Sequence, residues 1–217
     1  MAMTCNEMIE KITTITNSDI APLYCGLIDR NIKHFSLLTN SMNVTAVSPK
    51  AFYLCKNLTS VYLPDSITSI GEAAFTGCTN LLSCNLNENI TSIGNDAFNS
   101  CSLLALLSLP SKLNTIGDNA FSNCTLLRLS ALPTNLTYIG AKAFFMCTGI
   151  NIVNFPASLS SIGDNAFGFC NGLKSLTFHG IPTSIANNAF YRCTNITTIN
   201  VPWSEGAVAG APWSATR

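Results

Sequence analysis

Residues 116–133 read IGDNAFSNCTLLRLSALP, and the pattern of this stretch recurs along most of the chain with a constant 23-residue period. Each copy has an Ala-Phe dipeptide, an aliphatic residue five positions before the phenylalanine, and a cysteine three positions after it. The phenylalanines are Phe52, Phe75, Phe98, Phe121, Phe144, Phe167 and Phe190, and the cysteines are Cys55, Cys78, Cys101, Cys124, Cys147, Cys170 and Cys193. Seven copies without an insertion indicate a repeat protein.

A strict period this short predicts a solenoid, in which each turn buries its apolar side against its neighbours. We expect an α/β repeat solenoid, a leucine-rich-repeat horseshoe or rod, with stacked parallel strands. The main strand follows each cysteine, and alternation points Cys84 or Val153 and Leu86 or Phe155 into the core. Phenylalanines at equal spacing are then expected to stack as a column inside the solenoid.

The other half of each turn begins with a short apolar pair, as in Ile67-Thr-Ser-Ile70, followed by a glycine. We expect that glycine to provide a positive φ or a close backbone approach. The stretches from Asp118 to Phe121 and from Asp164 to Phe167 predict one short helical turn each, capped by the aspartate.

The unit I-G-x-x-A-F-x-x-C-x-x-L-x-x-L-x-L-P resembles the BspA-like class of leucine-rich repeats over residues 44–202. The resemblance implies a repeat solenoid without a catalytic site, from a family of bacterial and protist surface proteins and gut prophage-associated proteins that act in adhesion and protein binding. The stretch from Ile199 to Trp213 resembles the C-terminal ends of the prophage-associated members.

The ends of the repeat array are expected to carry caps, because an open solenoid exposes its outermost turns. Residues 1–43 are predicted to form an N-terminal cap, with an amphipathic helix over 4–16 and a degenerate first repeat. The strand pattern of that repeat aligns Phe35 with Val61, a longer spacing than the repeats have. Residues 44–202 form the seven repeats. Residues 203–217 are predicted to form a C-terminal cap, with Trp203 and Trp213 folded over the last turn.

Composition excludes several classes of function. Eleven Lys and Arg residues balance eleven Asp and Glu residues, which argues against a nucleic-acid partner, since that would require a basic surface. No apolar run is long enough for membrane insertion. The charged first residues, Met1 to Lys11, do not resemble a signal peptide. The family resemblance suggests a cell surface or a phage particle.

The ten cysteines predict no metal site or cofactor, because seven form one structural column and no C-x-x-C pair exists. We expect them to be reduced, buried thiols, although Cys5 and Cys25 lie outside the repeat and remain candidates for a pair. His179 has no nucleophile placed beside it by the repeat, and His34 lies in the degenerate first strand, where we expect it to be exposed. We therefore expect no enzyme activity.

The outward strand positions form two predicted rows. In one of them, Leu106, Leu129 and Ile152 are apolar between polar neighbours, which is typical of a protein-contact patch. We predict that these three residues, with Asn85, Ser108, Ala131 and Asn154 of the second row, bind a protein partner. On this prediction Leu129→Arg leaves the fold intact and weakens partner binding. The patch and the low charge also favour weak self-association.

The sequence therefore predicts a non-enzymatic protein-recognition or adhesion module that uses the strand face of the solenoid. Two alternatives remain open. One is a structural spacer within a larger surface or phage protein. The other is a glycan-binding module that uses the hydroxyl-rich row of Thr68-Ser69, Thr91-Ser92 and their equivalents on the short strands.

Overall fold

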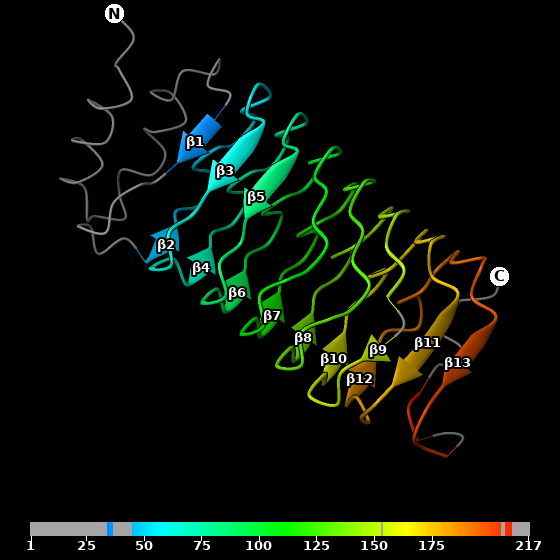
Figure 1. Cartoon of the computed structure of the whole chain (residues 1–217). Coiled ribbons are helices and arrows are strands. Elements are labelled where there is room, and N and C mark those ends of the chain that lie inside the picture. The colour runs from blue at the N-terminus through cyan, green and yellow to red at the C-terminus, as the bar shows by residue number, and fades with distance from the viewer. Residues whose placement is uncertain (1–33, 37–44, 153, 205–206, 210–217) are drawn as a thin grey trace, which may run out of the picture.

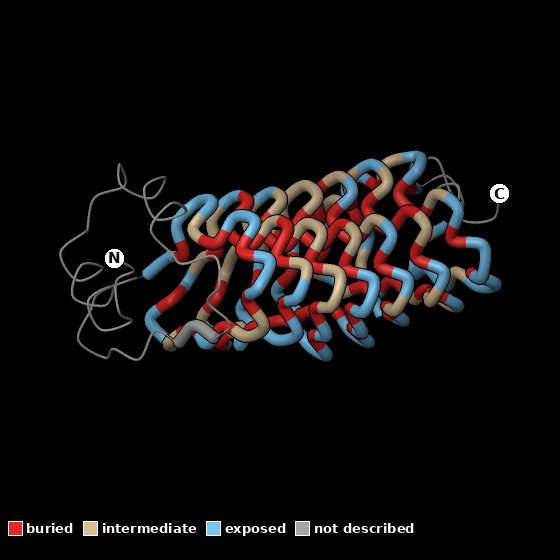
Figure 2. The backbone as a smooth tube through the Cα atoms, turned by 90° about the horizontal axis from the view of Figure 1, so that it is seen from above, coloured by how far each residue is buried: buried red, intermediate tan, exposed pale blue. Residues whose placement is uncertain are grey.

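The computed structural model describes residues 34–36, 45–152, 154–204 and 207–209. These residues form an elongated stack of turns around one apolar core (Figure 1). Every turn has three sides, which we call the strand face, the short-strand face and the turn face. In Figure 2 the buried positions line the interior of the stack, and the exposed positions lie on the outside of each turn.

The short-strand face is a continuous parallel sheet of seven two-residue strands. Adjacent strands pair one repeat apart, as in Ser92 with Thr115 and Ile93 with Ile116. The first residue of each strand lies outward and the second is buried. The strands are β2 (Ala46–Val47), β4 (Ser69–Ile70), β6 (Ser92–Ile93), β7 (Thr115–Ile116), β8 (Tyr138–Ile139), β10 (Ser161–Ile162) and β12 (Ser184–Ile185).

The strand face carries two separate parallel sheets rather than one. Their strands are β1 (His34–Ser36), β3 (Ser60–Tyr62) and β5 (Ser83–Asn85) in one sheet, and β9 (Asn154–Phe155), β11 (Ser175–Phe178) and β13 (Thr198–Asn200) in the other. β1 pairs with β3 in the predicted alignment, with Phe35 opposite Val61. Between the two sheets, the turns at 106–108 and 129–131 form no strand, and only an isolated bridge joins Ala131 to Asn154.

The turn face is not helical, so the predicted helical turns are wrong. Asn119 and Asn123 have φ angles of 53° and 62°, and this left-handed conformation is incompatible with a right-handed helix. Alternate N–H groups of this segment bond to the next turn instead, from Asn119 to Ala141 O and from Phe121 to Ala143 O at 2.8 and 2.7 Å. The predicted capping helix over 4–16 lies outside the described residues.

The glycine after the short strand, present in the five inner repeats, permits a close approach between successive turns. A Cβ atom added to Gly140 would lie 2.5 Å from Asp118 N and 2.6 Å from Gly117 C, closer than real Cβ contacts. The expected close approach is confirmed, whereas the positive φ angles of the turn fall on other residues. Instead of capping a helix, the Asp118 carboxylate accepts a hydrogen bond from Ala141 N at 2.8 Å.

The core is built from repeated columns of identical side chains. The phenylalanine rings from Phe52 to Phe190 stack with centroids 4.9 to 5.5 Å apart and interplanar angles of 3° to 15°. At the C-terminal end, the Trp203 ring meets Phe178 edge-on at 5.4 Å, and Val208 is buried. Trp213 lies outside the described residues.

Candidate functional site

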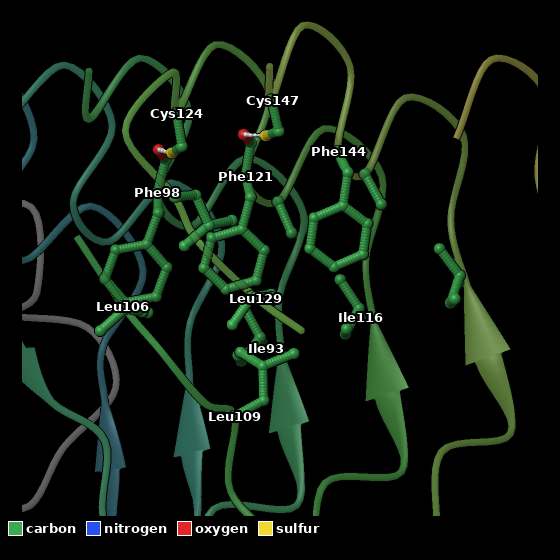
Figure 3. Packing of buried hydrophobic residues seen from close by; sticks show 14 of the residues in the cluster. Ile93, Phe98, Leu106, Leu109, Ile116, Phe121, Cys124, Leu129, Phe144 and Cys147 are labelled. Carbon is green, nitrogen blue, oxygen red and sulfur yellow. Dashed lines mark hydrogen bonds between the residues drawn. The ribbon is translucent and has the colours of Figure 1, made fainter. Parts of the chain in front are cut away.

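The predicted contact patch does not exist as an exposed apolar surface. Leu129 and Ile152 have no exposed area, and Leu106 is 9% exposed. All three belong to the main core cluster. Figure 3 shows Leu106 and Leu129 on the inner side of the turns, beneath the column of phenylalanine rings. These residues stabilise the fold, and the prediction that they are exposed is wrong.

The reason is that the strand face has two burial patterns, one in the three middle turns and the other in the turns on either side of them. In the turn of Leu81, the buried positions are Leu81 and the third residue after it, Cys84. In the turn of Leu127, the buried positions are Leu127 itself, Leu129 two residues later and Leu132 five residues later. The turns that begin at Leu104 and Ile150 follow the second pattern. Both patterns bury apolar side chains, but they differ in whether the second or the third residue after the first buried one points inward.

The backbone hydrogen bonds of the strand face also change in the middle turns. Ala105 N donates to Leu82 O, at the full repeat spacing. In the next two turns, Arg128 N donates to Leu106 O and Asn151 N to Leu129 O, so the acceptor lies one position nearer in the sequence. This change interrupts the parallel ladder, which explains why the strand face has two sheets. Val153, which the sequence places in the core, lies outside the described residues.

The second predicted row is exposed, as its spacing indicates. Asn85, Ser108, Ala131 and Asn154 all lie on the surface. A residue that the sequence reasoning assigned no role, Leu107, is 72% exposed beside this row, directly before Ser108. Toward the C-terminal end, His179 Nε2 is hydrogen-bonded to Asn154 Oδ1 at 3.0 Å. The strand face is therefore largely polar, with Leu107 the most exposed of its large apolar side chains, ahead of Leu82 and Tyr62 at 53% and 50%.

The cysteine column has a structural role. In six cysteines of the column, Cys78, Cys101, Cys124, Cys147, Cys170 and Cys193, the Sγ–H donates to the carbonyl oxygen of the phenylalanine in the preceding turn, at 2.8 to 3.1 Å. Burial raises the pKa of Cys147 and Cys193 to about 12, and raises the pKa of Cys124 and Cys170 well above its ordinary value. At neutral pH these groups are thiols, not the thiolates that act as nucleophiles or metal ligands.

Nowhere among the described residues do three His, Cys, Asp or Glu side chains gather in a way that could hold a metal ion. Nor do these residues include a helix with the length and apolar character needed to cross a membrane.

The hydroxyl row of the short-strand face is used within the solenoid. Thr68 Oγ1 donates to Thr45 O at 3.0 Å, and Thr137 Oγ1 donates to Asn114 O at 3.1 Å. Thr91 and Ser160 make the same contact with the turn before them. Because these hydrogen bonds join successive turns, the regular spacing of hydroxyl residues on this face has a structural cause.

A cluster on the turn face was missed by the sequence reasoning. Its residues are Lys142, Phe145, Met146, Phe169, Tyr191 and Arg192, and we call them the turn-face cluster. The Phe145, Phe169 and Tyr191 rings meet edge-to-face at 5.3 and 5.6 Å. The Arg192 guanidinium lies 5.7 Å from the Phe169 centroid and 5.5 Å from that of Tyr191. The signal was available, because all but Lys142 occupy the two positions directly after the repeated phenylalanine.

Comparisons with known proteins agree with this architecture. A family model described as BspA type Leucine rich repeat region (6 copies) matches residues 29–131 and 127–205. The crystal structure of a T. pallidum leucine-rich repeat protein (TpLRR) is similar at a TM-score of 0.70 and 30% identity, over 78% of this chain and 80% of that one. No curated protein matches the chain.

A leucine-rich repeat protein from Bacteroides ovatus ATCC 8483 is similar at a TM-score of 0.69 and 26% identity, over 78% of this chain and 46% of that one. This chain thus spans less than half of the Bacteroides protein. The repeat motif, the register of its strands and the match of the family model over most of the chain lead to one conclusion: this chain belongs to the BspA type leucine-rich repeat family.

Proposed function

We propose that this chain is a non-enzymatic protein-recognition or adhesion module whose strand face contacts a protein partner. Leucine-rich repeat proteins are generally binding modules, and solenoids bind through extended surfaces. The observation that carries the proposal is the exposed row of Asn85, Ser108, Ala131 and Asn154, with Leu107 protruding beside it.

This surface has the composition of a contact site with an apolar centre and a polar rim. Leu107 is the apolar centre of the proposed contact site, in place of Leu106, Leu129 and Ile152, which are buried. Ser108 and Ala131 are small exposed residues of the row that would allow a partner to approach the backbone closely. The row is held on a rigid backbone, so little conformational entropy is lost on binding. Display on a bacterial surface or a phage particle, which the family resemblance implies, is part of the proposal.

The test is retention of proteins from an extracellular-matrix extract on the immobilised chain, measured by quantitative mass spectrometry. We expect Leu107→Asp and Ala131→Arg to lose the same proteins that the wild type retains, by about tenfold, a loss of the size found at the centre of an interface. Both positions are exposed, so both variants should fold. Ala46→Arg, an exposed change on the short-strand face, is the matched control.

Equal retention by the wild type and both strand-face variants would contradict the proposal. That result would favour the spacer alternative, in which no face has a distinct role. The glycan-binding alternative receives less support, because four of the hydroxyl groups it invokes, those of Thr68, Thr91, Thr137 and Ser160, donate to the backbone of the preceding turn.

A further inference from the structure

The turn-face cluster lies on a different side of the solenoid from the strand face and spans its last three turns. Its cations are held against aromatic rings. Arg192 Nε donates to Tyr191 Oη at 3.1 Å, and Lys142 Nζ lies 6.0 Å from the centroid of the Phe145 ring. Phe145 in turn extends over Gly168, where an added Cβ would lie 2.9 Å from its ring. The cluster is thus one continuous surface of rings and cations.

The backbone at this cluster is strained. Met146, Phe169 and Arg192 have φ angles of 60°, 61° and 55°, a left-handed conformation that disfavours large side chains. The equivalent positions of three earlier turns hold Gly77, Ser100 and Asn123, small or polar residues that suit this conformation better.

Leu54 occupies the same row near the other end, where its side chain covers Gly77. The fold alone therefore does not require the large residues of the turn-face cluster, which is consistent with a role in binding.

Charge is distributed unequally along the described chain. Residues 139–204 contain Lys142, Lys174 and Arg192 against the single carboxylate of Asp164, a net charge of 3 − 1 = +2. Residues 45–138 contain four Lys and Arg residues against five Asp and Glu residues, a net charge of 4 − 5 = −1. The cluster therefore lies in the positively charged part of the described chain, and a ligand of complementary charge would be acidic.

We propose that the turn-face cluster is a second recognition site, and that its ligand is an acidic protein segment in which carboxylates alternate with apolar side chains. The inference rests on the proposed function as a recognition module, but it assigns a separate surface. When the face of a guanidinium lies on a ring, its edge still presents N–H donors to a carboxylate. Phe, Tyr, Met and Arg are among the residues enriched in protein interfaces.

A sugar ligand fits this surface less well. A sugar ring stacks on an open aromatic face, whereas these rings meet edge-to-face at angles of 81° and 82° and carry cations over their faces.

The test is fluorescence anisotropy with a short, fluorescein-labelled peptide of alternating Glu and Phe, compared with its Gln–Phe and Glu–Ser counterparts. We expect the Glu–Phe peptide to bind most tightly and its affinity to fall with added salt. Phe169→Gly and Arg192→Gln should each weaken binding by about tenfold, the loss expected for truncation at the centre of an interface. Phe169→Gly also relieves the left-handed strain, so loss of binding cannot be attributed to a lost fold.

Asn123→Gly, a change in the same row outside the cluster, is the matched control and should bind like the wild type. The proposal is overturned if the Gln–Phe peptide binds as tightly as the Glu–Phe peptide, or if Phe169→Gly binds unchanged. It is also overturned if an acidic oligosaccharide, and not the peptide, binds at the cluster.

Ala131→Arg separates this proposal from the proposed function, because it changes the strand face alone. If the Glu–Phe peptide does not bind, but Ala131→Arg still loses the retained proteins, only the second site is overturned. Failure of both assays overturns the recognition role itself.

Discussion

Leu129→Arg is expected to prevent stable folding, the opposite of what the sequence pattern alone predicts. Leu129 has no exposed area and belongs to the main core cluster. The substitution removes about 1.5–3 kcal/mol of hydrophobic stabilisation and places an unpaired guanidinium in an apolar interior, at a further cost of several kcal/mol. The sum approaches the whole stability of an ordinary domain, about 5–15 kcal/mol.

The measurement is the yield of soluble protein and the urea midpoint followed by circular dichroism. Ser130→Arg is the matched control, because Ser130 is the next residue and is exposed. It should change stability by less than about 0.5 kcal/mol, as surface substitutions usually do. A folded Leu129→Arg variant beside an unfolded Ser130→Arg variant would show that the constant register of the repeat continues through this turn after all.

Phe121→Ala is expected to cost about 3–5 kcal/mol, the range found for removal of a buried aromatic side chain. The ring has no exposed area and stacks between Phe98 and Phe144 with centroids 5.3 and 5.5 Å apart. Its loss leaves a cavity in the middle of the column. Because each turn of a solenoid contacts only its neighbours, the two halves should also unfold less cooperatively.

Urea unfolding monitored by circular dichroism gives both the midpoint and the steepness of the transition. Tyr62→Ala is a suitable comparison, because Tyr62 is an aromatic residue of the strand face that is 50% exposed. We expect this variant to lose far less stability and to keep the steepness of the wild type. An equal loss in the two variants would mean that the phenylalanine column is not a major source of stability.

The sequence predicted the columns and the stacking well, because these depend only on the repeat period. A constant period puts Phe on Phe and Cys on Cys in any solenoid whose turns are equal. The pairing of the short strands one repeat apart was predicted for the same reason. The alignment of Phe35 with Val61 correctly placed β1 beside β3.

The period could not predict which strand residues point outward. That choice depends on local alternation, and turns of equal length accommodate both observed patterns. Ser130 offered a warning, because a polar residue occupies the position that the constant register assigns to the core. The sequence was ambiguous at Leu106 and Leu107, where either leucine could be buried. Here the structure buries Leu106 and exposes Leu107.

The helical turns were predicted from a four-residue pattern that is equally compatible with a left-handed turn. Asn119 and Asn165 were available as clues, since asparagine adopts positive φ more readily than most residues. The turn-face cluster was missed because the repeat motif leaves the two positions after the phenylalanine unspecified. Those unspecified positions are where one turn can differ from the next without harm to the core.

The most direct test of the inward columns is alkylation of the native protein with iodoacetamide at neutral pH, followed by mass spectrometry of each cysteine-containing peptide. Cys101, Cys124 and Cys147 are buried without exposed area, and each donates its thiol proton to a backbone carbonyl. They should remain unmodified in buffer and react fully in urea. Alkylation of these three residues in the native protein at the rate measured in urea would contradict a solenoid with its cysteines inside.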